Sequence, residues 1–308
     1  MDLPGWWIDL LDPDESELLA VLPASVGAPK LGHLLELPRT SRQLRPRLEA
    51  VDHHLEGVLL AARRNGEELV IQEIHVIANP ELLVIVRKTP TTGDAFDTAP
   101  LAEWAAGAAA AGTEPVTPGM ALYRLMDEIA EDYLDLIDEF DAAIDQLEDE
   151  VEHLDALEVR DRISDLRHDL LHVRRVLAPT RDEARSILDG RLDLALGQLF
   201  PREVELHFAD VYDKLLRCMD GLELARDLLA GVRDYHQAQV AHAQNEVTKR
   251  LTAIASILLV PTFIVGLYGQ NFPNLPELSW RWGYAFSWAL IVVTTAGQIW
   301  WFRRRKWL

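Results

Sequence analysis

The chain has 308 residues, 49% of them hydrophobic and 26% charged, which is enough for two or three structural units with a substantial core. Fifty Asp and Glu residues oppose 30 Lys and Arg residues, and the formal charge of −20 argues against nucleic acid as a partner, because that binding needs a basic surface. The single cysteine, Cys218, excludes an internal disulfide and suits a reducing compartment.

The N-terminal segment MDLPGWWIDLLDPDE carries acids where a signal peptide needs a basic leader, so we expect most of the chain to stay in the cytoplasm. The sequence contains no GxxxxGK[ST] loop, no HExxH, no GxSxG and no paired CxxC. No nucleophile and base, and no set of three metal ligands, can be assembled from it. We therefore expect no enzyme activity.

Residues 1–115 are predicted to form a cytoplasmic α/β domain. Nearly continuous apolar runs separated by NG and NP turns predict strands over residues 6–11, 55–62, 68–78 and 81–88. A short helix is expected within 34–51, and an alanine-rich helix over Ala102–Gly112. The pair His53-His54 is interpreted as part of a strand edge.

Residues 116–200 are predicted to form two antiparallel helices, because apolar residues recur at steps of three and four. Fourteen acids and no Lys or Arg lie between Asp127 and Asp155, so one helix has a strongly negative outer face. A solvated surface is the default interpretation, and a reservoir that attracts cations is the alternative. The second helix is expected to end at Pro179. His168 and His172 share a helix face, but a metal site there lacks a third ligand.

Residues 201–268 are predicted to form one helix that starts at Pro201. Its 67 residues after this proline correspond to about 100 Å. A heptad seam of apolar residues occupies its first part: Phe208, Val211, Leu215, Cys218, Leu222, Ala225, Leu229 and Val232. We expect this seam to pack against sibling copies and the more polar turns after it to surround water. Cys218 is then a core residue and not a reactive thiol.

Two uncharged runs near the C-terminus predict a membrane hairpin. Leu251–Tyr268 has 18 residues and Trp282–Phe302 has 21, about 27 Å and 31 Å as helices, close to the roughly 30 Å of a hydrocarbon core. Basic residues precede the first run and follow the second, in the tail 303–308. Positive residues collect on the cytoplasmic side, so both termini are expected inside and the loop 269–281 outside.

The first span is less apolar than a simple anchor requires. Thr252, Ser256, Thr262 and Gly266 interrupt an otherwise aliphatic helix, and they either allow close helix packing or line a wet path. Pro261 frees a carbonyl inside the span, which is tolerable only beside protein or water.

Several segments resemble the CorA-type magnesium transporters: Asn245-Glu246-Val247, Leu251-Thr252, PTFIVGLYGQN, FPNLPELSWRWGY and the terminal FRRRKWL. The resemblance is close from about His207 to the last residue, and looser in WIDLLDP and RPRLEAVDHHL. The family motif is Gly-Met-Asn after a tyrosine. Gly269 and Asn271 match it, whereas Gln270 stands in place of the methionine.

The resemblance implies a funnel-shaped homopentamer in the inner (plasma) membrane: an α/β cytoplasmic domain, a stalk of long helices, first spans around a pore and second spans outside them. It places Asp210 and Asp234 at positions where divalent ions bind between subunits and hold the channel closed. It also places the following residues along the pore: Asn245, Thr248, Leu251, Ala255, Leu259, Thr262 and Gly266.

The chemistry of Mg²⁺ explains amides at the outer mouth. Mg²⁺ gives up its water reluctantly, and a ring of Asn271 oxygens can accept hydrogen bonds from the hydration shell without trapping the ion. Gly269 is expected to allow a tight turn beneath this ring. Glu277 concentrates cations just outside, and Leu251 and Leu259 form apolar collars that exclude water.

Gln270 leaves the ion preference open. A second polar amide at the mouth alters selectivity toward Co²⁺, Ni²⁺ or Zn²⁺, or else Gln270 faces a neighbouring subunit and changes only packing. Two other functions compete with a Mg²⁺ channel: a related Zn²⁺ transporter, which can be proton-coupled, and a membrane-anchored helical scaffold without transport.

Overall fold

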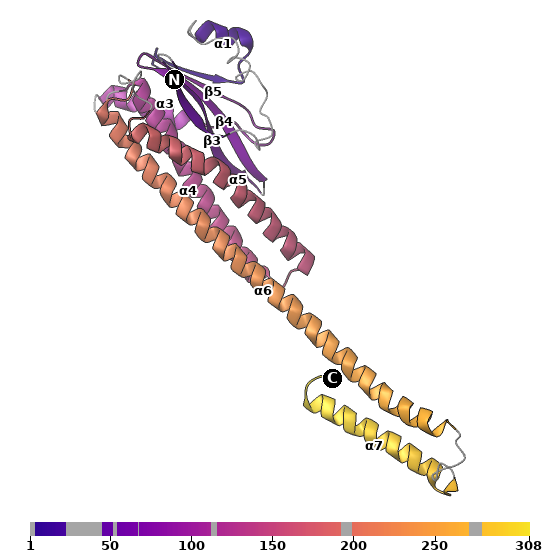
Figure 1. The fold of residues 1–308 in the computed structure, drawn as a ribbon. Helices are drawn as coiled ribbons and strands as arrows, with labels where there is room; N and C mark the ends of the chain where they lie inside the picture. The colour runs from indigo at the N-terminus through magenta and orange to yellow at the C-terminus, as the bar shows by residue number, and fades with distance from the viewer. Residues whose placement is uncertain are drawn as a thin grey trace. The chain divides into compact units, whose positions relative to one another are not determined.

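The structure is a computed structural model, and it describes residues 4–22, 45–51, 54–66, 68–111, 116–191, 199–270 and 279–308. The chain divides into two compact units, Met1–Val232 and Arg233–Leu308. One helix, α6 (Arg202–Tyr268), contributes to both units, as Figure 1 shows.

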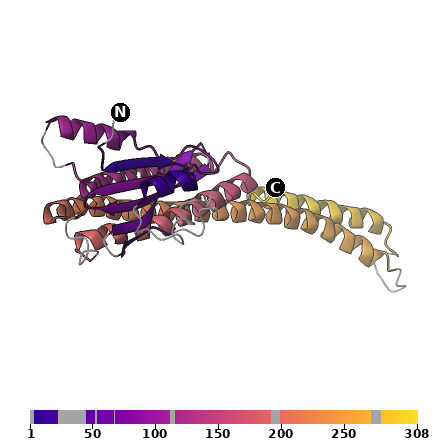
Figure 2. The same cartoon turned by 90° about the horizontal axis from the view of Figure 1, so that it is seen from above.

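The first unit contains a five-stranded sheet of order β1-β5-β4-β3-β2. Its strands are β1 (Trp7–Leu11), β2 (Arg47–Val51), β3 (His54–Asn65), β4 (Glu68–Asn79) and β5 (Leu82–Arg87). β1 pairs in parallel with β5, and the other described pairs are antiparallel. The sheet lies beside the long helices in Figure 2. The α/β class predicted for the N-terminal part is thus confirmed, with the four predicted strands present as β1, β3, β4 and β5.

The edge strand β2 occupies part of the segment in which a short helix was predicted. Residues 34–44 lie outside the described residues, but 47–51 pair with β3, with Arg47 opposite Val58 and Val51 opposite His54. The close approach of the two strands requires Gly57, because a Cβ there would lie 2.1 Å from the Arg47 carbonyl oxygen. Tertiary pairing therefore determines the structure of residues 47–51. His54 is buried in β3, whereas His53 lies outside the described residues.

A short helix that the sequence analysis did not predict, α1 (Glu15–Val21), covers one face of the sheet. It starts with a capping box, in which the Asp14 carboxylate accepts from the Glu17 amide at 2.8 Å and the Glu17 carboxylate accepts from the Asp14 amide at 3.0 Å. Leu18 is fully buried against Ile77, Val84 and Val86. The neighbouring strand residues point to the opposite face, which belongs to the main core.

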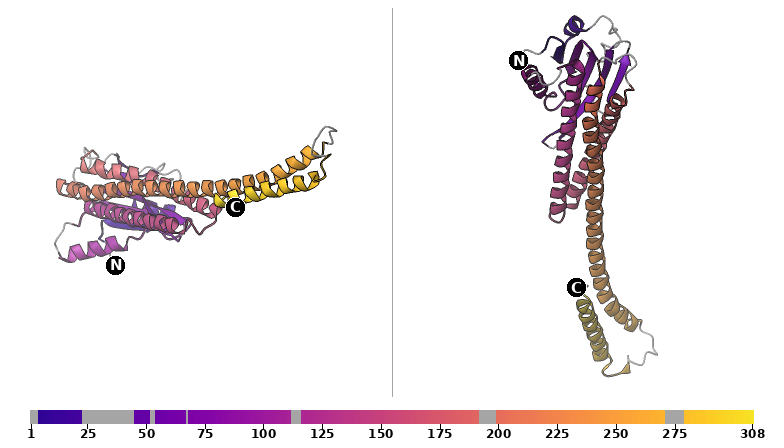
Figure 3. Two further views of the ribbon diagram at one scale, coloured as in Figure 1. Left: turned by 90° about the horizontal axis from the view of Figure 1, so that it is seen from below. Right: turned by 90° about the vertical axis from the view of Figure 1, so that its left-hand side faces the viewer.

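Helices α3 (Ala99–Ala111), α4 (Pro118–Glu150) and α5 (Ala156–Leu188) complete the unit with the first part of α6. α4, α5 and α6 run side by side against the sheet, as Figures 1 and 3 show. The sequence predicted that α5 ends at Pro179, but the helix continues to Leu188. The Thr180 hydroxyl donates to the Val176 carbonyl at 2.8 Å, which supports the helix where proline interrupts its backbone bonding.

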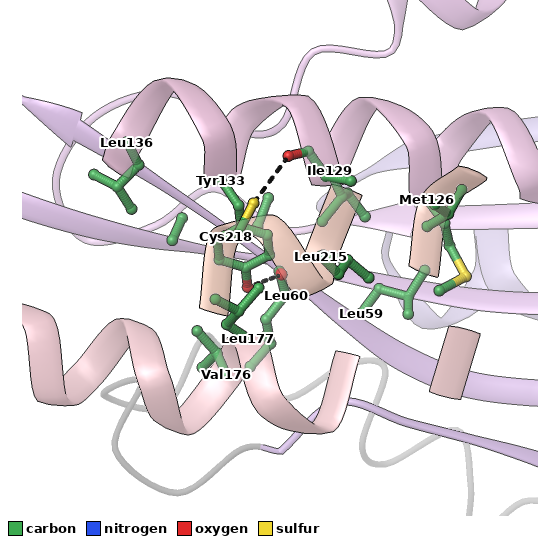
Figure 4. Close-up of a cluster of buried hydrophobic side chains, with 14 of the residues drawn as sticks. Leu59, Leu60, Met126, Ile129, Tyr133, Leu136, Val176, Leu177, Leu215 and Cys218 are labelled. Carbon is green, nitrogen blue, oxygen red and sulfur yellow. Dashed lines mark hydrogen bonds between the residues drawn. The ribbon is translucent and has the colours of Figure 1, made fainter. Parts of the chain in front are cut away.

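The centre of this core is shown in Figure 4, where α4, α5, α6 and β3 meet around Tyr133 and Cys218. The Tyr133 hydroxyl donates to the Leu60 carbonyl at 2.7 Å, and the Cys218 thiol lies 3.9 Å from the Ala130 carbonyl oxygen. Burial raises the pKa of the Cys218 thiol to about 12. A thiol in this state is a core group with no thiolate at neutral pH, as the heptad position predicts.

The apolar seam of α6 was predicted to pack against sibling copies. In the structure, α4 and α5 of the same chain bury it. All eight seam residues are at most 4% exposed in the single chain. Phe208 meets Tyr123 of α4 edge-on, and Lys214 Nζ lies 2.6 Å from the Asp127 carboxylate of α4. Heptad spacing identifies a buried seam, but it does not identify the partner that buries it.

Most acids of α4 lie at or near the surface, in line with a solvated acidic face. Asp132 is the exception, at 6% exposed, and it forms an ion pair with Arg63 of β3. Burial raises the pKa of Asp132, and the hydrogen bond from Arg63 opposes that shift. The Arg63 contact therefore offsets part of the desolvation of this buried α4 carboxylate.

The second unit is a hairpin made by the C-terminal part of α6 and by α7 (Gly283–Arg304), which lie alongside each other in all views (Figures 1–3). Both helices are long and apolar enough to cross a membrane. Their outward residues are large and apolar, among them Leu258, Phe263 and Val293, each more than 60% exposed. Exposed apolar surface of this extent indicates helices that face lipid or other copies of the chain.

Candidate ion pathway in the membrane hairpin

One side of α6 faces α7 within the hairpin. Ala253 and Ile264 are buried there, and they lie 11 residues apart, about three helical turns. Between them the Ser256 carbonyl accepts a hydrogen bond of 3.2 Å from the Gln298 side chain of α7. The residues that join the two helices therefore form one stripe along α6.

The seven residues predicted to line a pore lie on another side of α6. Ala255 is two positions from the buried Ala253, which turns it about 200° around the helix. The remaining positions follow it at helical spacing, and all seven are exposed in the single chain: Asn245, Thr248, Leu251, Ala255, Leu259, Thr262 and Gly266. This face is thus available to other copies of the chain or to water.

Two threonines on this exposed face present acceptor oxygens. The Thr248 hydroxyl donates to the Gln244 carbonyl at 2.8 Å, and the Thr262 hydroxyl donates to the Leu258 carbonyl at 2.7 Å. Because each hydroxyl hydrogen is used inside the helix, only oxygen lone pairs remain for an outside partner. Such oxygens suit the water molecules around a hydrated cation, which donate hydrogen bonds outward.

The end of α6 carries the first two residues of the predicted filter. The helix ends at Tyr268, and the Gly269 amide still donates to the Val265 carbonyl at 2.9 Å. Gly269 and Gln270 form a turn at the end of the helix, and Gly269 does not adopt a positive φ. A Cβ there would instead lie 3.1 Å from the Val265 oxygen, a tight contact. Gln270 is exposed, and Asn271 and Glu277 lie outside the described residues.

Comparison with known proteins identifies the family. Residues 6–304 match the family described as CorA-like Mg²⁺ transporter proteins. The chain belongs to this family. It is 28% identical to the "Putative metal ion transporter YfjQ" of Bacillus subtilis over 307 residues, which cover 99% of this chain and 91% of that protein.

Other CorA-like relatives match over shorter segments. The chain is 35% identical to the "Cobalt/magnesium transport protein CorA" of Thermotoga maritima over 187 residues, 61% of this chain and 52% of that protein, so the match spans about half of that relative. It is 26% identical to the "Zinc transport protein ZntB" of Yersinia enterocolitica over 197 residues, 64% of this chain and 58% of that protein. A solved structure of the full-length CmaX protein shares the fold with a TM-score of 0.67 at 22% identity, covering 100% of this chain and 91% of that one.

The two predicted regulatory acids of this CorA-like chain are both exposed on α6. They lie 24 residues apart, about 36 Å along the helix, so they cannot share one ion within a chain. Arg233 binds the Asp234 carboxylate at 2.9 Å. Asp234 is also the last of four exposed aspartates at seven-residue spacing, a pattern that the sequence analysis missed: Asp213, Asp220, Asp227 and Asp234.

Neither His168 nor His172 belongs to a cluster that could hold a metal. Among the residues that the structure describes, no group of three or more His, Cys, Asp or Glu side chains has that arrangement. His168 is exposed on α5, and His172 one turn later is half-buried. The minor alternative of a histidine metal site therefore gains no support from the described part of α5.

Sequence reasoning also missed the polar group that connects the two helices of the CorA-like hairpin. Gln298 and Thr295 of α7 lie inside an apolar run and were treated as part of an ordinary outer span. A signal was available, because a carboxamide in a 21-residue uncharged span is costly unless it has a partner. Helical periodicity alone does not say which residue of the other helix would meet it.

Proposed function

We propose that this chain is the subunit of a membrane channel that carries divalent cations, with Mg²⁺ as the main ion and Co²⁺ or Ni²⁺ as further substrates. Membership of the CorA-like family supports the class. The observation that carries the proposal is the exposed face of α6: it has no charged residue between Leu251 and Tyr268, it bears inward-bonded threonine hydroxyls, and it lies away from the α7 side. Several copies that turn this face inward would enclose an uncharged, partly polar path.

The assembly that this requires is a homo-oligomer, and the family resemblance suggests a pentamer. In it the first spans surround the axis and the second spans face lipid. The basic tail after α7 and the basic pair before Leu251 support an orientation with both termini in the cytoplasm. The channel would then lie in the plasma (inner) membrane with the loop 269–281 outside.

Selection at the outer mouth is assigned to Gly269, Gln270 and Asn271. The carboxamide oxygens of Gln270 and Asn271 accept hydrogen bonds from the water of a hydrated ion, so the ion does not have to lose its shell. Glu277 raises the local cation concentration without binding the ion directly. Flux needs no nucleotide, because two charges moving inward across 100 mV gain about 4.6 kcal/mol.

The decisive test is ion uptake by the purified protein in proteoliposomes. Mg²⁺, Co²⁺, Ni²⁺ and Zn²⁺ are offered outside, with and without Mg²⁺ inside, under an imposed inside-negative potential. We expect Mg²⁺ uptake that is inhibited by internal Mg²⁺. Absence of uptake of all four ions would reject the channel and leave a membrane-anchored scaffold as the better explanation.

A Zn²⁺ transporter is the second candidate, favoured by the match to "Zinc transport protein ZntB". The motif of CorA-type magnesium transporters continues with a Pro-Glu-Leu loop, and this chain retains it as Pro276-Glu277-Leu278, which argues against the zinc transporter. The two candidates differ in coupling, so Zn²⁺ uptake is measured at external pH 5.5 and 7.5 without a potential. Uptake that depends on the pH gradient and exceeds Mg²⁺ uptake would favour the zinc transporter.

Replacement of Gln270 tests the proposed filter. We expect Gln270→Met to reduce Co²⁺, Ni²⁺ and Zn²⁺ uptake relative to Mg²⁺ by about threefold to tenfold, since one good hydrogen bond per ring contributes about 1 kcal/mol. The measurement is the ratio of initial rates in the same proteoliposomes. Ion profiles identical to wild type would mean that Gln270 serves only packing between subunits.

Asp210 and Asp234 are assigned to regulation by internal divalent ions bound between subunits. We expect Asp234→Asn to raise the internal Mg²⁺ concentration that halves uptake by about fivefold or more, the range of an ordinary allosteric coupling. Asp182→Asn is the matched control, because Asp182 pairs with the preceding Arg181 in α5 as Asp234 pairs with Arg233. An equal shift in both variants would contradict the assignment.

A further inference from the structure

A side-chain hydrogen bond joins the two membrane helices. Gln298 Nε2 donates to the Ser256 carbonyl at 3.2 Å. The orientation is fixed by chemistry, because the Oε1 side of the carboxamide would repel a carbonyl oxygen. Gln298 Oε1 and the Thr295 hydroxyl are shielded from solvent and make no hydrogen bond in the described part of the chain. The polar contact between the helices thus depends on the Gln298 amide nitrogen.

A glutamine at this position of the membrane span is energetically costly. The span Trp282–Phe302 has no charged residue, and a methionine or leucine would anchor it in lipid at lower cost. Hydrogen bonds between membrane helices contribute modestly but in a directional way. A carboxamide aimed at a backbone carbonyl of the other helix therefore indicates a role in positioning that helix.

The contact lies beside the turn of α6 that contains a proline. Pro261 has no amide hydrogen, so the Ile257 carbonyl lacks its helical donor. Ser256, the acceptor for Gln298, directly precedes this residue. The turn around 256–261 is therefore the part of the span where α6 bends most readily, and Gln298 holds α6 there.

The side of α6 that Gln298 contacts determines the direction in which the hydrogen bond pulls this helix. Ser256 lies on the α7 side of α6, and the pore-lining face proposed above is turned away from it. A tie on that side can only pull α6 outward, away from the axis of an oligomer. We propose that Gln298 is a positioning residue that holds the pore helix toward α7 and so favours the wider, conducting pore. This inference rests on the proposed channel function.

The first test compares Gln298→Met with wild type in proteoliposomes. Methionine keeps the size and removes the donor, so we expect initial Mg²⁺ uptake to fall by about threefold to tenfold, with the order of ion preference unchanged. Thr294→Val is the matched control. The Thr294 hydroxyl donates to Leu290 within α7 itself, at 2.7 Å, so its loss leaves uptake near the wild-type rate.

The second test restores the donor conditionally. In Gln298→Glu, a protonated carboxyl can donate to the Ser256 carbonyl and an ionised one cannot. We expect uptake by this variant to rise as pH falls from 8 to 5.5, relative to wild type under the same conditions. Neither span contains an Asp, Glu, His, Lys or Arg. The wild-type spans therefore have no side chain of these types that could change its charge between pH 8 and 5.5. A packing defect would not produce this pH dependence. The same folded preparation is measured at both pH values, so a difference in folding between samples cannot cause the change.

The outcomes separate the inference from the function on which it rests. If wild type takes up no divalent ion, the channel proposal fails and Gln298 has no pore to position. If wild type conducts and Gln298→Met conducts equally, or Gln298→Glu shows the pH profile of wild type, the positioning role is overturned alone. Size-exclusion profiles equal to wild type exclude misfolding as the cause of a lower rate.

Discussion

Proteoliposomes with the Leu259→Ala variant are expected to take up Mg²⁺ about tenfold faster than wild type when internal Mg²⁺ is saturating. This increase corresponds to a loss of about 1.4 kcal/mol from the free energy of gate closure. Leu259 is 69% exposed in the single chain and lies on the proposed pore face. A ring of leucines there would exclude water from the closed pore. Alanine shortens each side chain and widens the ring, so water and hydrated ions pass.

Ile254→Ala is the control for this leak. Ile254 is also apolar and exposed, at 49%, but it precedes Leu259 by five residues and is turned from it by about 140° around the helix. We expect its basal uptake to match wild type. Leu251→Gly, two turns before Leu259 on the same face, should leak as well. Unchanged basal uptake in both leucine variants would contradict the collar assignment.

The sequence predicts the fold well where one physical signal dominates. Charge-free runs of membrane length identify the hairpin, and heptad spacing identifies the buried seam of α6. Strand β2 and helix α1 depend on less visible signals. β2 forms because β3 offers a pairing edge at Gly57, and α1 forms because Asp14 and Glu17 cap a short apolar segment. A capping box can be recognised in the sequence, whereas the pairing partner of a strand is determined by the tertiary structure.

The candidate pathway is only partly predictable for a similar reason. Helical periodicity places Thr248, Leu259 and Thr262 on one face, but it does not say whether α7 or solvent meets that face. The structure shows α7 on the side of Ala253 and Ile264. In the first unit the same uncertainty led to a wrong prediction, because α4 and α5 bury the α6 seam within one chain. The sequence pattern defines which residues are covered, and only coordinates define what covers them.

The start of α4 is a position at which the first unit should tolerate an added methyl group poorly. Gly119 follows Pro118 in the first turn, and a Cβ there would lie 2.0 Å from the Leu199 carbonyl oxygen. The Leu199 backbone leads into α6, and both Leu199 and Phe200 are buried. We expect Gly119→Ala to lower the stability of the unit by about 3 kcal/mol or more, because the α6 start must move away from α4. For a unit of this size that corresponds to a melting temperature lower by about 6 to 12 °C.

Gly107→Ala in α3 is the matched control for this substitution. No atom lies within 4 Å of a Cβ at Gly107, and alanine is favoured over glycine in a helix by about 1 kcal/mol, so its melting temperature should rise by about 2 to 4 °C. Thermal unfolding followed by near-ultraviolet circular dichroism of the full chain in detergent measures both. The same glycine-to-alanine change is therefore expected to shift the melting temperature in opposite directions in α4 and α3. Of the two glycines, only Gly119 has a neighbouring backbone where the new methyl group would lie. Equal shifts in the two variants would mean that the α4 start does not hold the α6 start in place.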